Sequence, residues 1–511
     1  MSIGRTRAVA LIGLRGVIVE VEADIASGLP KFALVGMPDR ALVEAADRVR
    51  SGIVNSGFAM PNQRVTVSLS PASLPKSGSG FDLAVAMAAL AASGVVSGDA
   101  VASVVHIGEL ALDGRLRPTA GVLPAVLAAA QSGARAVIVP HANRTEAALV
   151  EGIEVISAVS LAHVVAWHGT DCELPEVDPI ELADAGKSEI AGLLDLNEVV
   201  GQSDAVEALV VAAAGGHHMF MLGPPGAGKT MLASRLPGIL PDLTTEQALE
   251  VACSRSLTPG EQVFELSVRP PFEAPHHSAT IAALVGGGSG VIRPGAVARA
   301  SHGVLFLDEA PEFHRATLDA LRQPLESGTI VIARAAMSAS FPARFQLILA
   351  ANPCPCGRFG LPGNECACPS LSRRRYLERL SGPLRDRIDM TIRLPRVSPA
   401  QCTASGAASV SSAEAKSRVV AARARAGERW HSHGWQTNST VPGSILRGGR
   451  WRLDAAQTRE LDRAVNLGRL SMRGYDRVLR LAWTLADLDS QPRPTGEHIG
   501  RALQLRGGVF V

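Results

Sequence analysis

The sequence contains no apolar run long enough to cross a membrane, which excludes an integral membrane protein built on helices. Such a helix needs roughly 18 consecutive apolar residues, and the Ala-rich stretch at 84–96 is shorter and carries Ser and Gly. Residues 1–17 resemble a signal peptide, but Arg15 ends their short apolar patch, which indicates a first β-strand instead. We therefore expect a cytoplasmic protein with no membrane partner.

Cysteine is also scarce, because the 511 residues include only seven, an odd number. This count in a long chain argues against a framework of disulfide bonds. Four of the seven nevertheless fall in one stretch, ANPCPCGRFGLPGNECACPS, as C-P-C and C-A-C pairs with nine residues between them. A metal site, a redox switch and an accident of composition are all open explanations of this stretch.

The formal net charge of +2 hides an uneven distribution. From Arg396 onward the chain has 18 basic and nine acidic residues, a net charge of +9, so the preceding residues sum to −7. A basic C-terminal module suggests contact with nucleic acid, whereas solvated helix faces would carry the same charges without any ligand. Charge alone does not choose between these two interpretations.

Length and periodicity predict an α/β protein of three domains, since 511 residues with 47% hydrophobic content can bury several cores. Residues 1–170 alternate strands such as QRVTVSLS with helical stretches such as FDLAVAMAALAASG. Residues 171–196 are acidic, contain two prolines and resemble a linker. A second α/β block follows at 197–395, and residues 396–511 carry helical periodicity.

A nucleotide-binding motif follows an apolar strand in the second block. HHMFMLGPPGAGKTMLASRL contains G-x-x-x-x-G-K-[ST] and opens into a helix, the context that a P-loop requires. Consecutive backbone N–H groups in such a loop wrap phosphates, and the helix N-terminus adds partial positive charge. We expect the lysine to neutralise β/γ-phosphate charge and the threonine to ligate Mg²⁺. The residues predicted to bind ATP are Gly223, Pro224, Pro225, Gly226, Ala227, Gly228, Lys229 and Thr230.

The sequence GVLFLDEA supplies the second half of this site. Four apolar residues predict a buried parallel strand, and Asp308 and Glu309 follow at its C-terminal end, where α/β sheets bind ligands. Asp308 suits Mg²⁺ coordination, and Glu309 suits polarising the attacking water. FQLILAAN ends another strand with Asn352, where a sensor of the γ-phosphate would lie.

Two arginines, Arg385 and Arg387, close the stretch RRRYLERLSGPLRDRIDM. The planar guanidinium suits phosphate oxygens in a transition state. An arginine far from its own P-loop would serve the site of a neighbouring subunit, so we expect the chain to assemble into a ring.

Together these motifs resemble the magnesium-chelatase-like AAA+ ATPases of the competence protein ComM (YifB) family. The resemblance rests on GPPGAGKT, residues 269–313, LRQPLESG, AANPCPCG and RLSGPLRDRID, and it extends over the whole chain. It implies ATP and Mg²⁺ as cofactors, an AAA+ core at 197–395 and a helical C-terminal lid at 396–511. It further implies that Glu309 and Asn352 act in catalysis, Arg387 as arginine finger and Arg477 as the sensor-2 arginine. Members of the family act as hexameric helicases that drive branch migration of transforming DNA.

A hairpin and an insert are expected between the two nucleotide motifs. TIVIARA is β-branched, and Ser338 to Pro342 supply turn residues, which predicts a strand, a turn and a further strand. By resemblance this is the pre-sensor hairpin, where Arg334 and Arg344 would contact DNA phosphates; ordinary edge charges would look the same. In the insert EAPHHSATIAALVGGGSGVIRPG, adjacent histidines on a helix would not share a face, which favours a positioning role over metal binding.

The N-terminal block, through GELALDGRLRPTAGVLPAVLAAAQSGARAVIVPHAN, resembles the Lon-protease-like domain, an α+β fold. A Ser–Lys dyad would need a serine and a lysine where this chain has Gly80 and Pro124, and residues 77–186 contain no lysine at all. Ser77 and Ser79 lie nearby, but a serine without a base is a weak nucleophile. We predict an inactive protease-like domain at 1–170 that serves as a scaffold or guides DNA.

The four clustered cysteines begin two residues after Asn352, beside the predicted nucleotide site. Four thiolates from two turns suit tetrahedral Zn²⁺, although the usual spacing is C-x₂-C. Structural zinc, free thiols and redox sensing are the three interpretations. The residues concerned are Cys354, Cys356, Cys366 and Cys368.

The function that these features favour is an ATP-driven DNA motor. A metal-chelatase motor subunit shares the ATPase core but works with a partner that carries a D-x-S-x-S motif, and no such motif occurs in this chain. A protein-remodelling chaperone, the third interpretation, is compatible with the basic lid.

Overall fold

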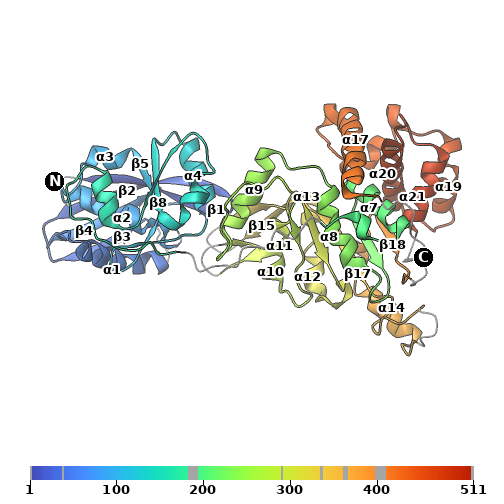
Figure 1. The fold of residues 1–511 in the computed structure, drawn as a ribbon, viewed down its shortest axis with the longest axis horizontal. Coiled ribbons are helices and arrows are strands. Elements are labelled where there is room, and N and C mark those ends of the chain that lie inside the picture. The colour runs from blue at the N-terminus through green and yellow to red at the C-terminus, as the bar shows by residue number, and fades with distance from the viewer. Residues whose placement is uncertain are drawn as a thin grey trace.

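The structure of the protein is a computed structural model that describes residues 3–36, 40–76, 78–181, 194–288, 292–333, 338–360, 366–397 and 410–507. A seven-stranded sheet, a five-stranded sheet and a group of C-terminal helices follow one another along an elongated molecule (Figure 1). None of the helices in these ranges has the length and apolar character that a membrane span requires.

The N-terminal sheet has the strand order β3-β4-β2-β1-β5-β8-β9. Its strands are β1 (Gly4–Ile12), β2 (Arg15–Ala26), β3 (Lys31–Val35), β4 (Arg64–Ser70), β5 (Val104–His106), β8 (Ala136–Pro140) and β9 (Glu154–Ala158). β1 pairs antiparallel with β2, and β2 with β4, whereas the other neighbours run parallel. The expected first strand near the N-terminus is confirmed as β1, and QRVTVSLS forms β4.

Helices cover both faces of this sheet. On one face lie α1 (Arg40–Asn55) and α2 (Asp82–Ala92), and every residue of α2 is buried. The other face packs against α4 (Val122–Gln131), which in turn packs against α9 (Thr245–Ser256) of the central part of the chain. The hydrophobic core around α4 therefore joins the N-terminal sheet to the nucleotide-binding half, and α9 lies between them in Figure 1.

The central sheet is entirely parallel, with the strand order β11-β14-β17-β10-β18. Its strands are β10 (Met219–Leu222), β11 (Phe272–Glu273), β14 (Val304–Leu307), β17 (Gln346–Ala351) and β18 (Met390–Arg393). β10, β14 and β17 are buried throughout, as expected for a parallel sheet with helices on both faces. The pairing of Leu222 with Ala351 brings the ends of β10 and β17 to the same edge.

A hairpin of β15 (Thr329–Ala333) and β16 (Ser338–Pro342) stands apart from this sheet. The prediction that 338–342 forms the turn is wrong, because these residues are the second strand. Their side chains alternate between exposed and buried, with Ala339 and Phe341 fully buried. Arg334 lies outside the described residues, and so does Ser77 in the N-terminal half.

The tip of the β1–β2 hairpin packs on β16. Leu11, Ile12 and Leu14 contact the cluster that holds Ala339 and Phe341. Gly13, between them, has φ +64°, and a Cβ there would come within 2.5 Å of the Ser340 carbonyl oxygen. This packing explains why a stretch of small polar residues forms a strand.

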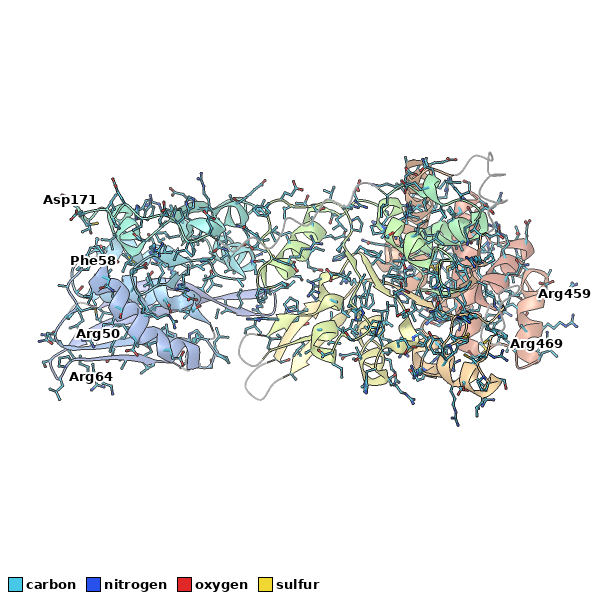
Figure 2. All side chains as sticks on the ribbon, turned by 60° about the horizontal axis from the view of Figure 1, so that its bottom comes forward. Arg50, Phe58, Arg64, Asp171, Arg459 and Arg469 are labelled. Carbon is cyan, nitrogen blue, oxygen red and sulfur yellow. The ribbon has the colours of Figure 1, made fainter. Side chains whose placement is uncertain are left out.

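The C-terminal helices are α17 (Ser412–Trp430), α19 (Ala455–Asn466), α20 (Met472–Leu488) and α21 (Gly496–Arg506). The helical periodicity predicted for this region is confirmed. α17 and α20 share one hydrophobic core with α7 (Ser203–Gly215) of the central part, including the buried Trp430 and Trp483. Arg459 and Arg469 lie at the outer end of the helical region, far from the N-terminal sheet (Figure 2).

Candidate nucleotide site

The predicted phosphate-binding loop connects β10 to α8 (Lys229–Ile239). Gly226 and Gly228 have φ angles of +74° and +82°, which residues other than glycine rarely adopt. The helix α8 begins directly after Gly228. Lys229 is buried, and its Nζ donates to the carbonyls of Gly223 at 2.7 Å and Pro224 at 3.0 Å. The loop thus has the compact turn and the helix N-terminus that suit a phosphate chain.

Burial lowers the pKa of Lys229, while the nearby carboxylates Asp308 and Glu309 act in the opposite direction. The loop itself contains no acidic residue to balance the buried charge of Lys229. A buried cation of this kind fits an anionic ligand at this position. The residues present therefore suit ATP.

The two halves of the predicted site meet at Thr230 and Asp308. The Thr230 hydroxyl donates to Oδ2 of Asp308 at 2.7 Å, although the residues lie on different elements. Oδ1 of Asp308 accepts the backbone N–H of Glu309 at 2.9 Å, which fixes the carboxylate. A hydroxyl and a carboxylate oxygen are ligands of the kind that Mg²⁺ prefers, so both residues fit the ion.

Glu309 occupies an unusual backbone conformation at the end of β14. Its φ of +49° is left-handed, which costs a non-glycine residue about 1–3 kcal/mol and is typical of functional sites. Oε2 of Glu309 lies 3.4 Å from Nδ1 of His277, whose ring centroid is 4.0 Å from that of His276. The two histidines lie before α10 (Ile281–Val285) rather than on a helix, and the contact with Glu309 suits a positioning role.

Asn352 follows β17 and faces the same lysine. Its Oδ1 accepts a hydrogen bond of 3.0 Å from Nζ of Lys229. A further hydrogen bond joins the backbone of Asn352 to Tyr376, a buried residue of α14 (Ser370–Glu378). Burial and the charges of Glu312 and Glu309 raise the pKa of Tyr376 to about 12, so its phenol stays protonated. No sequence motif pointed to Tyr376.

Arg477, the predicted sensor-2 residue, lies at the opposite edge of the central sheet. It forms an ion pair with Asp389 and donates from Nε to the carbonyl of Asp386 at 2.6 Å. Asp389 immediately precedes β18, and its backbone N–H bonds to the carbonyl of His218, immediately before β10. Because a strand rises about 3.3 Å per residue, the P-loop beginning at Gly223 is about 16 Å away along β10.

Arg387, the predicted arginine finger, lies at that same edge. It forms an ion pair with Glu326 and donates to the carbonyl of Pro383 at 2.5 Å. A cleft of about 1210 Å³ runs between this edge and the C-terminal helices. Within the described part of the chain, no P-loop residue lines the cleft. Its lining includes the carboxylates of Asp386, Asp389 and Asp476 together with the arginines Arg344, Arg387, Arg423, Arg477 and Arg480.

The structure therefore separates the predicted catalytic residues into two groups. Lys229, Thr230, Asp308, Glu309 and Asn352 lie together at the C-terminal edge of the sheet. Arg387 and Arg477 line the cleft at the other edge. Arg344, the described member of the predicted DNA contacts, also lines the cleft, at the base of the β15–β16 hairpin.

The four clustered cysteines bring their sulfurs within 4.8 Å of one another, so the cluster has the geometry to bind a metal ion. Cys354 is fully buried, whereas Cys356 is exposed. The backbone N–H of Arg358 and the neighbouring thiols lower the pKa of Cys356 to about 6, whereas burial and the neighbouring thiols raise the pKa of Cys354.

The N-terminal part contains no Ser–Lys dyad among its described residues. Ser79 donates to the carboxylate of Glu109, and the carbonyl of Gly80 accepts a backbone hydrogen bond from Gly108 at 3.0 Å. Lys76, which lies beside this loop, is completely buried and donates to the carbonyls of Gly36 and Leu69, both at 3.0 Å. An ammonium group held by carbonyl oxygens is not a base for Ser79.

Comparison with known proteins identifies the family to which the chain belongs. Three family models match the chain: "Subunit ChlI of Mg-chelatase" over residues 21–143, "Magnesium chelatase, subunit ChlI" over 195–402, and "Magnesium chelatase, subunit ChlI C-terminal" over 409–506. The chain is 27% identical over 176 residues to the Lon protease of Mycolicibacterium smegmatis, which covers 32% of the chain and 22% of that protease. The resemblance to Lon is therefore partial.

Several relatives align along their whole length. An uncharacterised protein of Mycobacterium tuberculosis is 48% identical over 509 residues, 99% of each chain. The competence protein ComM of Haemophilus influenzae is 41% identical over 509 residues, 100% of this chain and 98% of ComM. The YifB protein of Escherichia coli is 40% identical over 507 residues, 99% of this chain and 97% of YifB. The chain belongs to the ComM (YifB) family of magnesium-chelatase-like proteins.

Proposed function

We propose that this protein is the subunit of an ATP-driven, hexameric DNA motor of the helicase or branch-migration type, acting in recombination or in uptake of transforming DNA. The observation that carries the proposal is the 2.7 Å hydrogen bond between Thr230 and Asp308. This bond places the P-loop next to the carboxylates that follow the buried strand β14. Nucleotide hydrolysis requires this arrangement.

In this proposal the backbone of 223–228 wraps the phosphates of ATP, and Lys229 neutralises their charge. Thr230 and Asp308 would hold Mg²⁺, which would further neutralise the phosphate charge. Glu309 orients the attacking water and takes up its proton, and Asn352 contacts the γ-phosphate. The left-handed backbone of Glu309 and its contact with His277 support this role, because both fix the direction of the carboxylate.

Arg387 and Arg477 act on the nucleotide of a neighbouring subunit. The separation of about 16 Å along β10 between their edge of the sheet and the P-loop supports this part of the proposal. A ring places the cleft of one subunit against the P-loop edge of the next. ATP would then lie between subunits, so that hydrolysis changes how they pack.

DNA as the substrate is supported by three observations. The relative in Haemophilus influenzae carries the name competence protein. The residues from Arg396 onward have a net charge of +9, and some of these arginines, such as Arg459 and Arg469, are exposed at the outer end of the helical region. Arg344 follows β16, the second strand of the hairpin proposed to contact phosphates.

The proposal divides the chain into three domains and a linker. Residues 1–170 form an inactive Lon-protease-like scaffold, 171–196 a linker, 197–395 the ATPase core and 396–511 the lid. Because α9 packs on α4 and β16 packs on the tip of the β1–β2 hairpin, the scaffold has a direct connection to the motor.

The ATPase rate of the purified full-length protein, with and without branched DNA, tests this function. The proposal predicts stimulation by branched DNA and no activity in Lys229→Ala. Hydrolysis that no DNA alters would contradict it. A magnesium-chelatase motor is the second candidate, favoured by the names of the three matching family models. Stimulation only by a partner with a D-x-S-x-S motif would establish that alternative.

A further inference from the structure

The loop after β17 and the segment before α14 bring four cysteines together. Cys354 and Cys356 follow β17, and Cys366 and Cys368 precede α14. The sulfur of Cys354 lies 3.3 Å from that of Cys356 and 3.6 Å from that of Cys366, and Cys356 and Cys366 are also 3.6 Å apart. All four sulfurs lie within 4.8 Å of one another.

These separations have a specific chemical meaning. A disulfide bond needs sulfurs about 2.05 Å apart, so the cysteines are close without being bonded to each other. Four ligands in a tetrahedron around Zn²⁺, each at a Zn–S distance of about 2.3 Å, are about 3.8 Å apart. The observed distances approach that value. A set of four thiolates selects a soft or borderline metal such as Zn²⁺ over Mg²⁺ or Ca²⁺, which prefer oxygen.

The sulfurs also have a hydrogen-bond donor of the kind that supports metal ligands. The backbone N–H of Phe359 donates to the sulfur of Cys354 at 3.4 Å. The ring of Phe359 in turn lies under the guanidinium of Arg373 in α14, 4.0 Å from its central carbon. Donors to a ligand sulfur fix its orientation and lower its charge, so the loop is built to hold the sulfurs in place.

The cysteine loop touches the candidate nucleotide site. Gly357 has φ +74°, and a Cβ added there would lie 2.7 Å from both Cγ and Cδ of Pro225 in the P-loop. The same Cβ would be 4.0 Å from Cγ of Asn352, the proposed γ-phosphate sensor. The backbone at Gly357 therefore packs directly on two parts of the phosphate-binding side.

We propose that Cys354, Cys356, Cys366 and Cys368 bind one Zn²⁺ ion, which holds the loop after β17 against Pro225 and Asn352. All four ligands come from the protein, so the ion has no open position and its role is structural. The zinc site stands on the sulfur geometry alone, whereas its effect on nucleotide binding rests on the proposed ATPase function.

The first experiment measures metal content. The full-length protein, purified without chelators, should contain about one zinc per chain by elemental analysis. Cys366→Ser with Cys368→Ser should lose this zinc, and Cys172→Ser, which changes a cysteine outside the cluster, should keep it. Because the buried Cys354 is left intact, this variant is suited to remain folded, which circular dichroism checks.

Three results would overturn the zinc site. The first is protein prepared with zinc in the buffer that nevertheless binds none, and the second is a Cys366/Cys368 variant that retains zinc. The third is a native mass lower by two or four hydrogens than that of the reduced chain, which would identify disulfide bonds. Iron in place of zinc would equally overturn the identity of the metal.

The second experiment separates the loop's effect on the nucleotide site from zinc binding. Gly357→Ala and Gly360→Ala both place a side chain at positive φ, +74° and +83°, but only the first meets Pro225; nothing lies within 4 Å of the second. Both variants should keep zinc. Gly357→Ala should weaken binding of a fluorescent ATP analogue by tenfold or more, and Gly360→Ala should leave it near wild type.

Equal affinities in these two variants would overturn the contact between loop and nucleotide while leaving the zinc site standing. Zinc-loaded wild-type protein that binds no nucleotide would instead contradict the proposed function, again without touching the metal site. The two failures are therefore distinguishable.

Discussion

Arg477 and Asp389 form an ion pair at the edge of the central sheet that lies opposite the P-loop. Asp389 is only 1% exposed. Burial alone would raise its pKa, but the charge of Arg477, with His217 3.8 Å away, holds the pKa of Asp389 well below its usual range. The residue proposed to act on a neighbour's nucleotide is thus also a structural element of its own subunit.

Removing Arg477 should therefore destabilise the fold. Arg477→Ala leaves a buried carboxylate without its partner, and we expect a loss of about 3–5 kcal/mol in the free energy of unfolding. Arg473→Ala is the matched control, because Arg473 is exposed and lies 3.7 Å from Asp386; it should cost less than about 1 kcal/mol. Urea unfolding measures both values, and equal small losses would show that the buried pair contributes nothing.

A double variant separates stability from catalysis. Arg477→Met combined with Asp389→Asn removes both charges and should recover much of the lost stability. Its ATP hydrolysis should remain impaired, because the neighbouring site has lost the cation of Arg477 and keeps only that of Arg387. Recovery of full hydrolysis would exclude a catalytic role for Arg477.

Glu309→Gln should bind ATP but hydrolyse it about 10²-fold more slowly or worse, because water activation is lost while the phosphate contacts survive. Glu312→Gln is the matched control, since Glu312 lies three residues on and pairs with Arg379 on the surface. Steady-state hydrolysis and binding of a fluorescent analogue distinguish the two effects. A wild-type rate in Glu309→Gln would assign the base elsewhere.

His277 should matter through Glu309 rather than through a metal. His277→Ala removes the side chain whose Nδ1 lies 3.4 Å from the Glu309 carboxylate, and a loss of its orientation should lower turnover by about tenfold or more. ATP affinity should stay unchanged. His276→Ala removes the adjacent ring, which pairs with Ser278 instead, and should have little effect on turnover. If His276→Ala is the more damaging variant, the assignment of the positioning residue is wrong.

Stability should depend on pH through Glu146, which lies where α9 docks on the N-terminal part. Burial raises the pKa of Glu146 to about 7, against hydrogen bonds from Ser256 and Asn143 that act to lower it. Because the folded pKa exceeds the unfolded value of 4.5, this contribution to stability is complete below about pH 4.5 and is lost as pH rises to about 7. The loss amounts to about 3 kcal/mol.

Glu146→Gln should flatten this pH dependence, whereas Glu151→Gln, which changes an exposed glutamate nearby, should preserve it. Unfolding by urea at intervals between pH 5 and 8 supplies the comparison. Identical slopes for the two variants would exclude Glu146 as the titrating group.

The nucleotide motifs were predictable because each follows a short apolar run. The carboxyl ends of parallel strands meet at one edge of a sheet, so Gly223, Asp308 and Asn352 were expected to converge. In the structure Lys229 of the P-loop donates a hydrogen bond to Asn352, and Thr230 donates one to Asp308, as expected. Tyr376 and the contact of His277 with Glu309 were missed, because both depend on how distant segments fold back on the site.

The hairpin shows why local chemistry can mislead. Ser338 to Pro342 has small residues and proline, which favour turns when judged locally. The segment forms a strand because Ala339 and Phe341 find a hydrophobic partner in Leu11, Ile12 and Leu14 of the N-terminal hairpin. Such long-range packing overrides local preference and leaves no signal in the segment itself.

The central claim, a ring whose subunits complete one another's sites, is tested most directly by mixing two inactive variants. Arg387→Ala keeps its P-loop and Lys229→Ala keeps its finger, so a mixed ring contains interfaces where both are intact. An arginine finger supplied in trans is worth about 10³-fold or more in rate. The account predicts partial recovery of ATP hydrolysis that depends on the mixing ratio, and no recovery at any ratio in rings shown to be mixed would contradict it.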